Sequence, residues 1–191
     1  MVSVLVGGIP GGGTKYVARV IDACGRSAGH ETMLKDNPNI MRPTIHEVEV
    51  SWLCVEWFPI FKGKNILIAR APYNVIRSLY GFGFLISRQY PLFLKDEEFM
   101  YYSGVERLAR FYINWMLRSL NYADEVWNVH NLDYYKLAKI VPSPHKASTV
   151  DKDTNSKIAH WSEVDMPWPP DCEPELTDTA ELLGVPTRVG G

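Results

Sequence analysis

The feature that most constrains the fold is a short apolar run that ends in a dense group of glycines. Residues 2–6 are almost all branched and apolar, and the seven residues 7–13 then contain five glycines. Apolar residues next recur at helical spacing until Gly25, which is placed to end a helix. This order predicts a buried parallel strand, a tight loop and a helix whose N-terminus lies above the carboxyl end of the sheet.

The same order of strand and helix recurs along the chain. Residues 66–69 predict a second buried strand that stops at Arg70, and Pro72 suits the first turn of a helix. Further predicted elements are a helix over 103–120, a strand over 125–129, a helix over 132–140, a proline-rich loop over 166–174 and a closing helix over 174–184. We therefore expect one α/β domain over residues 1–191, a three-layer parallel sheet with helices on both faces.

Composition excludes several classes of protein. Of 191 residues, 46% are hydrophobic and 22% are charged, which is ordinary for a globular chain, and a net charge of −2 disfavours nucleic-acid or membrane-surface binding. Cys24, Cys54 and Cys172 fit neither a disulfide framework nor a zinc site. The N-terminal apolar run is short and lacks a basic leader, and no stretch has the length of a membrane span. We therefore expect a cytoplasmic protein with reduced thiols.

The glycine-rich loop predicts a site for a phosphate group. Its backbone amides and the helix N-terminus attract an anion, while Thr14 offers a hydroxyl and Lys15 a charge. Five glycines also exceed what a turn alone would require. A Walker A loop ends in lysine followed by serine or threonine. Here Thr14 precedes Lys15, so no hydroxyl follows the lysine to bind magnesium. We therefore expect a P-loop-like fold whose loop differs from a Walker A loop.

Two segments resemble the sulfotransferases that use 3′-phosphoadenosine 5′-phosphosulfate (PAPS). Residues 10–16 are similar to the loop that binds the 5′-phosphosulfate in this family. Residues 66–80, ILIARAPYNVIRSLY, resemble the segment whose arginine and serine, eight positions apart, bind the 3′-phosphate, and Arg70 and Ser78 have this spacing. A guanidinium and a hydroxyl are suitable donors for a phosphate dianion. Weaker similarities lie at residues 128–132 and 182–185.

The resemblance implies which residues hold the donor. They are Gly11, Gly12, Gly13, Thr14, Lys15 and Tyr16 for the phosphosulfate and Arg70 with Ser78 for the 3′-phosphate. Gly11 stands where the family usually has a basic residue, and we expect Lys15 to supply that charge. A polar stretch with Lys146, Lys152 and Lys157 resembles the family's C-terminal basic loop. No metal is implied.

Residues 26–32, RSAGHET, are similar to a glycine-glutamate-threonine segment in which the glutamate is the general base of tyrosylprotein-type sulfotransferases. We expect Glu31 or His30 to accept the acceptor's proton, with Glu31 favoured, from the end of a short second strand. The acceptor would be a small molecule, a carbohydrate or a peptide with a hydroxyl or amine group. Two alternatives remain: a P-loop kinase that uses ATP and magnesium, and a nucleotide-binding module without catalytic activity.

Overall fold

The computed structural model describes residues 2–33, 44–83, 104–150 and 166–188. Its strands are β1 (Val4–Gly7), β2 (Ala28–His30), β3 (Val48–Val50), β4 (Lys64–Ala69) and β5 (Glu125–Asn128). Its α-helices are α1 (Thr14–Ala23), α2 (Pro72–Gly81), α3 (Gly104–Leu120), α4 (Tyr134–Ala138) and α6 (Glu173–Leu182). Short 3-10 helices are η1 (Trp52–Glu56), η5 (Pro144–Thr149) and η7 (Pro170–Cys172). None of the described helices has the length and apolar character that crossing a membrane would require.

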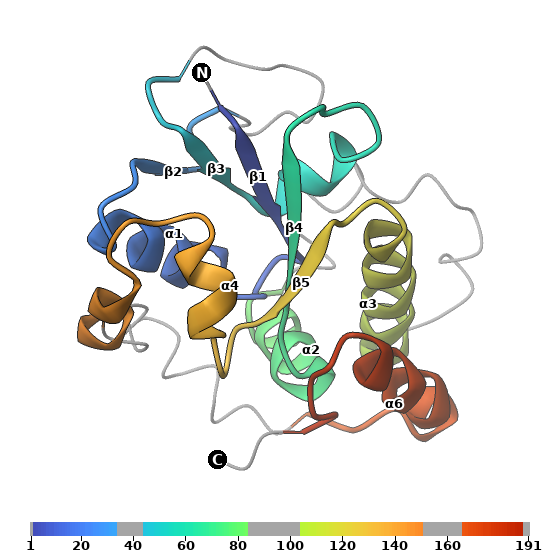
Figure 1. Ribbon diagram of the computed structural model, residues 1–191. Coiled ribbons are helices and arrows are strands. Elements are labelled where there is room, and N and C mark those ends of the chain that lie inside the picture. The colour runs from blue at the N-terminus through green and yellow to red at the C-terminus, as the bar shows by residue number, and fades with distance from the viewer. Residues whose placement is uncertain (1, 34–43, 84–103, 151–165, 189–191) are drawn as a thin grey trace.

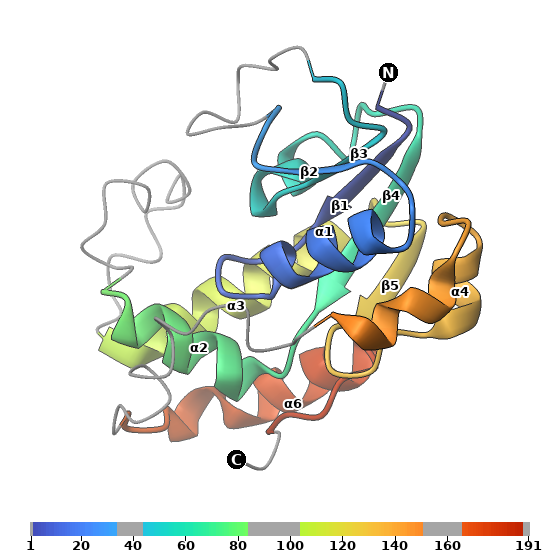
Figure 2. The same cartoon turned by 90° about the vertical axis from the view of Figure 1, so that its left-hand side faces the viewer.

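The five strands form one parallel sheet in the order β2-β3-β1-β4-β5. Figure 1 shows α1 and α4 on one side of this sheet and α3 and α6 on the other. Figure 2 looks from the α1 side, where α1 crosses in front of the strands and α4 lies beside it. The predicted α/β class and the helix layers on both faces of a parallel sheet are confirmed.

Successive side chains of the central strands point to opposite faces of the sheet and so form two separate apolar layers. Leu5 of β1 and Leu67 of β4 face the layer of α2, α3 and α6. Val6 and Ile68, the next residue on each strand, face the layer of α1 and α4. All four side chains are fully buried, as expected for strands of a parallel sheet that is covered on both faces.

The helices begin and end where their sequences indicate. Gly13 adopts a left-handed conformation (φ 97°) at the N-cap of α1, and Gly25 (φ 90°) follows the end of that helix. Pro72 opens α2, where its missing N–H costs no hydrogen bond. On α3 the predicted inward residues are all buried: Val105, Leu108, Ala109, Tyr112, Trp115 and Met116. The observed elements differ from the predicted ones by one or two residues at their ends.

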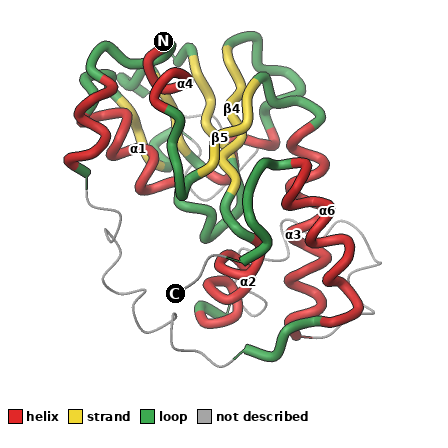
Figure 3. The backbone as a smooth tube through the Cα atoms, turned by 60° about the horizontal axis from the view of Figure 1, so that its bottom comes forward, coloured by secondary structure: helices red, strands yellow, loops and turns green. Residues whose placement is uncertain are grey.

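Because every strand is parallel, all five carboxyl ends lie along one edge of the sheet. Figure 3 shows this edge from below, with α2 beneath the strand ends and α3 and α6 running side by side. The glycine-rich loop leaves β1 at this edge, Arg70 leaves β4, and Glu31 follows β2. The fold therefore brings the ends of three predicted segments to one side of the molecule.

Candidate functional site

The site lies where the chain leaves two neighbouring strands in opposite directions. β1 leads through α1 to β2 on one side of the sheet, whereas its neighbour β4 leads through α2 and α3 to β5 on the other side. In open parallel sheets such a reversal leaves a crevice at the carboxyl ends, and ligands bind there. The glycine-rich loop and Arg70 occupy this position.

The glycine-rich loop turns sharply before α1. Gly11 and Gly13 both have left-handed backbone conformations (φ 75° and 97°), and Gly12 N–H donates to the carbonyl of Ile9 at 2.8 Å. Gly13 is the N-cap of the ten-residue helix α1, and its absent side chain leaves the first turn without a side-chain cap. The positive end of this helix is thus presented at the crevice.

The expectation that five glycines exceed the needs of a turn is wrong. A Cβ on Gly7 would lie 2.7 Å from Phe58, and one on Gly8 would lie 2.6 Å from Ile68. A Cβ on Gly12 would lie 2.7 Å from the Ile9 carbonyl, and one on Gly13 would lie 2.9 Å from Val129. Packing therefore explains these glycines, and their number alone does not indicate a ligand. The groups gathered around the loop carry more weight.

Arg70 and Ser78 both meet the loop at Gly11. The Nη1 of Arg70 donates to the Gly11 carbonyl at 3.0 Å, which uses one of the five N–H groups of the guanidinium. Ser78, on the second turn of α2, is 7% exposed, and its Oγ would lie 3.1 Å from a Cβ on Gly11. Burial lowers the pKa of Arg70. The two proposed 3′-phosphate donors therefore turn toward the glycine-rich loop and not away from it.

Helix α3 holds both loops of the crevice in place. Tyr112 donates its hydroxyl to the Arg70 carbonyl at 2.9 Å, and Trp115 donates its indole N–H to the Gly8 carbonyl at 2.6 Å. Both side chains are almost fully buried, and burial raises the pKa of Tyr112. The sequence places these residues on the inward face of α3 but does not reveal their contacts. The only signal was two polar groups among the apolar residues of that face.

The base candidates lie beside the start of α1. Thr14 Oγ1 is 3.2 Å from His30 Nε2, and Glu31 Oε1 is 3.9 Å from the same nitrogen. Burial lowers the pKa of His30, and the Lys15 charge lowers it further, while Glu49 acts in the opposite direction. The lowered pKa favours the neutral imidazole, which weakens any ionic character of the contact with Glu31. As predicted, β2 is short and delivers His30 and Glu31 next to the loop.

A hollow of about 370 Å³ opens on the α1 side of the sheet. Its lining includes Tyr16 of α1, Leu132 after β5, Tyr134 of α4 and His145 of η5. This size is within the usual range for small-molecule sites. Tyr16 is in the first turn of α1, the helix that follows the glycine-rich loop.

The remaining candidate residues have different outcomes. Lys146 is exposed on η5 beside that hollow, whereas Lys152 and Lys157 lie outside the described residues. The two weaker similarities do come together, because Asn128 donates its side-chain amide to the Gly184 carbonyl at 3.1 Å. Lys15 is exposed on the first turn of α1.

The sequence was compared with protein-family models and with curated proteins, and neither comparison gave a match. Within the described ranges, no group of three or more His, Cys, Asp or Glu side chains is arranged so that it could hold a metal ion. The three cysteines are free and buried.

Proposed function

We propose that this protein is a sulfotransferase that moves the sulfuryl group of PAPS to a hydroxyl or amine acceptor. One observation supports this function above the others. The Arg70 guanidinium and the buried Ser78 hydroxyl meet the glycine-rich loop at Gly11, two residues before the uncapped N-cap of α1. These are the donor types that anionic groups of a nucleotide require.

The residues have distinct roles in this proposal. The backbone amides of Gly11 and Gly13, together with Thr14 and Lys15, bind the 5′-phosphosulfate, while the Gly12 N–H keeps its bond to the Ile9 carbonyl. Arg70 and Ser78 bind the 3′-phosphate, and the hollow beside Tyr16 accepts the nucleoside. Helix α3 fixes the loops through Tyr112 and Trp115, so the donor groups are positioned before the ligand arrives.

The transfer needs one proton acceptor and one charge stabiliser. The acceptor's oxygen or nitrogen bonds to sulfur while the bond from sulfur to the bridging phosphate oxygen breaks. His30 or Glu31 takes the acceptor's proton, and a neutral imidazole is able to do so because burial keeps its pKa low. The departing phosphate gains negative charge, which Lys15 and the loop amides stabilise.

The structure offers a reason for the missing basic residue at position 11. A side chain there would face Ser78 and would require a left-handed backbone conformation that is unfavourable for lysine or arginine. Lys15 is exposed on the first turn of α1 and is therefore the cation proposed to replace it.

Thermal unfolding in the presence of nucleotides tests the proposal. A ligand that binds only the folded state raises the melting temperature by mass action. We expect 3′-phosphoadenosine 5′-phosphate to raise it and ATP with magnesium to leave it unchanged. The opposite result would identify a P-loop kinase and overturn the proposal.

A second experiment separates an enzyme from a binding module. Labelled PAPS is offered with a panel of hydroxyl and amine acceptors that includes sugars, small phenols and a tyrosine peptide. Transfer of label to one class supports catalysis and identifies the acceptor. Binding of the nucleotide without transfer to any acceptor would indicate a module without catalytic activity.

A further inference from the structure

Glu49 is a buried carboxylate whose hydrogen-bond donors, among the residues that the structure describes, all come from one turn. It lies in the middle of β3 and is 0% exposed. Its Oε1 accepts the N–H of Thr32 at 2.8 Å and of Met33 at 3.0 Å, and its Oε2 accepts the Thr32 hydroxyl at 2.6 Å. A buried carboxylate is costly unless it is hydrogen-bonded, so these three bonds hold the turn firmly against β3.

Gly29 provides the space that this arrangement needs. A Cβ at position 29 would lie 2.2 Å from the Thr32 hydroxyl and 2.9 Å from Glu49 Oε2. It would also lie 2.7 Å from the His46 ring. Any larger residue would therefore separate Thr32 from Glu49. Gly29 thus leaves room for the hydrogen bond that Thr32 donates to Glu49.

The turn also determines the position of Glu31. Its backbone N–H donates to the Val50 carbonyl at 3.2 Å, while the next two residues are held by Glu49. Between these two attachments Glu31 adopts φ 56°, the one left-handed non-glycine residue among the described residues. Such a conformation is unfavourable and persists because the surrounding contacts impose it.

From these contacts we propose that Glu49 is a positioning residue, which holds the turn 31–33 so that His30 and Glu31 face the glycine-rich loop. The inference rests on the proposed function, because the direction of His30 and Glu31 affects catalysis only if one of them is the base that takes the proton of the sulfate acceptor. Glu49 itself is fully buried and acts through Thr32 and Met33.

Charge provides a second, independent readout. The groups that act on His30 are Thr14 and Lys15 of α1, Glu31 of the turn and Glu49 of β3. The negative charge of Glu49 raises the pKa of His30 against the effects of burial and of Lys15. Removing this charge should lower the pKa of His30 further.

The test compares Glu49→Gln with Thr32→Val and its matched control Thr32→Ser. Glutamine can still accept both backbone N–H groups, so Glu49→Gln mainly removes the charge, and the His30 NMR titration should shift to lower pH. Thr32→Val removes the hydroxyl donor at an exposed position, where unfolding is not expected. Amide exchange at residues 32 and 33 should quicken about tenfold or more, and Thr32→Ser should resemble wild type.

In transfer assays, Thr32→Val should lower kcat and leave KM for PAPS unchanged, because the turn is not part of the proposed donor site. The positioning role is overturned if kcat, amide exchange and the His30 titration all match wild type in both variants. If amide exchange and the His30 titration change as expected, but wild type transfers no label from PAPS and 3′-phosphoadenosine 5′-phosphate has no thermal effect on it, the contact stands and the sulfotransferase proposal fails.

Discussion

At the scale of single residues, Gly11 is the point where the proposed site is assembled. Its left-handed backbone turns its carbonyl toward Arg70, and its missing side chain leaves room for Ser78. A basic side chain at this position would require an unfavourable left-handed backbone and would face Ser78. The proposed anion site thus depends on the backbone geometry of the loop and on side chains from the segment 70–78.

Replacing Gly11 with alanine should damage both stability and binding. A left-handed alanine costs about 1–2 kcal/mol, and its Cβ would press on the Ser78 hydroxyl. We expect weaker binding of 3′-phosphoadenosine 5′-phosphate in calorimetry. The control is Gly184→Ala, which has φ 66° but no neighbour within 4 Å. Gly184→Ala should lose a comparable amount of stability and keep the nucleotide affinity of wild type. Equal nucleotide affinity in the two variants would contradict the role of Gly11 in binding.

Lys15 should be essential for turnover. Loss of a charged group that stabilises the leaving phosphate typically costs about 100-fold or more in kcat, so Lys15→Ala is expected to lose that much in a labelled-PAPS assay. Arg19→Ala removes an exposed charge one helical turn further from the loop and should change kcat by about twofold at most, because solvent screens it. A small loss in Lys15→Ala would show that this cation is not catalytic.

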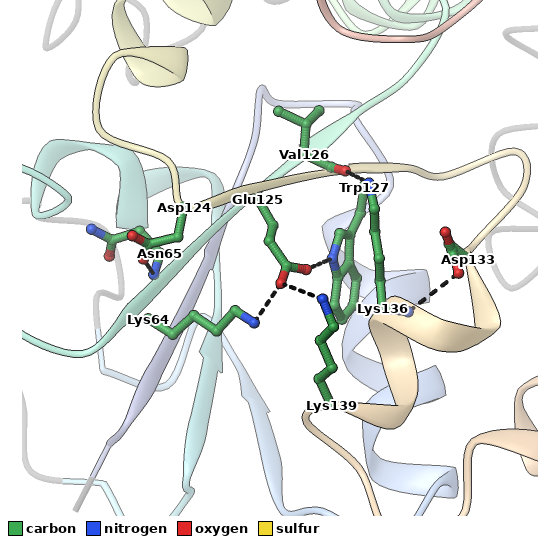
Figure 4. A network of polar contacts seen from close by, with 9 residues as sticks. All are labelled: Lys64, Asn65, Asp124, Glu125, Val126, Trp127, Asp133, Lys136 and Lys139. Carbon is green, nitrogen blue, oxygen red and sulfur yellow. Dashed lines mark hydrogen bonds and ion pairs between the residues drawn. The ribbon is translucent and has the colours of Figure 1, made fainter.

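At the scale of elements, α4 is attached to the sheet by a polar network at the start of β4 and β5. Glu125 accepts from Lys64 at 2.7 Å and from the Trp127 indole at 3.0 Å, and Lys139 lies 3.6 Å away. Lys136 of α4 donates to the Val126 carbonyl at 2.8 Å. Figure 4 shows these contacts converging between the strands and the helix. The network fixes one wall of the hollow beside Tyr16.

Glu125→Gln should therefore destabilise the fold in a pH-dependent way. Burial alone would raise the pKa of Glu125, but the hydrogen bonds from Lys64 and Trp127 and the charges of Lys64 and Lys139 outweigh it and lower the pKa. The ionised Glu125 carboxylate therefore adds to the free energy of unfolding. This contribution is complete above the pKa of glutamate in the unfolded chain, about 4.3. It is lost as the pH falls through the lower pKa of Glu125 in the folded protein.

Chemical denaturation measures this effect. At pH 7 Glu125→Gln should lower the free energy of unfolding by about 1–2 kcal/mol, and the difference from wild type should close in acid. Glu181→Gln, at an exposed position on α6, should cost less than about 0.5 kcal/mol at either pH. A Glu125→Gln difference that stays constant down to pH 3 would exclude the ionised carboxylate as its source.

Most elements could be predicted because their patterns are local. The strands before the glycine-rich loop and before Arg70 are short apolar runs, and α3 shows a long helical pattern. β3 was not predicted, because three residues with glutamate in the middle resemble a polar segment more than a buried strand. Burial of Glu49 depends on the turn that folds against it, which is a tertiary effect.

The candidate site was predictable to the same extent. Gly11–Lys15, Arg70, Ser78, His30 and Glu31 follow from sequence position, and the structure brings them to one edge of the sheet. The contacts from Tyr112, Trp115 and Glu49 could not be foreseen, since each joins segments that are distant in the chain. The sequence therefore predicted the candidate residues at the strand ends, and the structure revealed the buried side chains that hold them.

At the scale of the whole molecule, the amino ends and the carboxyl ends of the strands carry different groups. The amino ends of β4 and β5 carry the stabilising network of Glu125. The carboxyl ends carry the base candidates after β2, and also the glycine-rich loop and Arg70, which α3 holds through Trp115 and Tyr112. Two apolar layers pack the helices against the two faces of the sheet and so hold the strands, with both of their ends, in place. The proposed donor spans the reversal point between β1 and β4.

The most direct measurement is the calorimetric affinity of wild type for 3′-phosphoadenosine 5′-phosphate and for adenosine 5′-phosphate, which lacks only the 3′-phosphate. If Arg70 and Ser78 bind that group, the first ligand should bind about tenfold or more tightly than the second, and Arg70→Ala should abolish the difference. Equal affinity of wild type for the two nucleotides, or no binding of either, would contradict the proposed donor site.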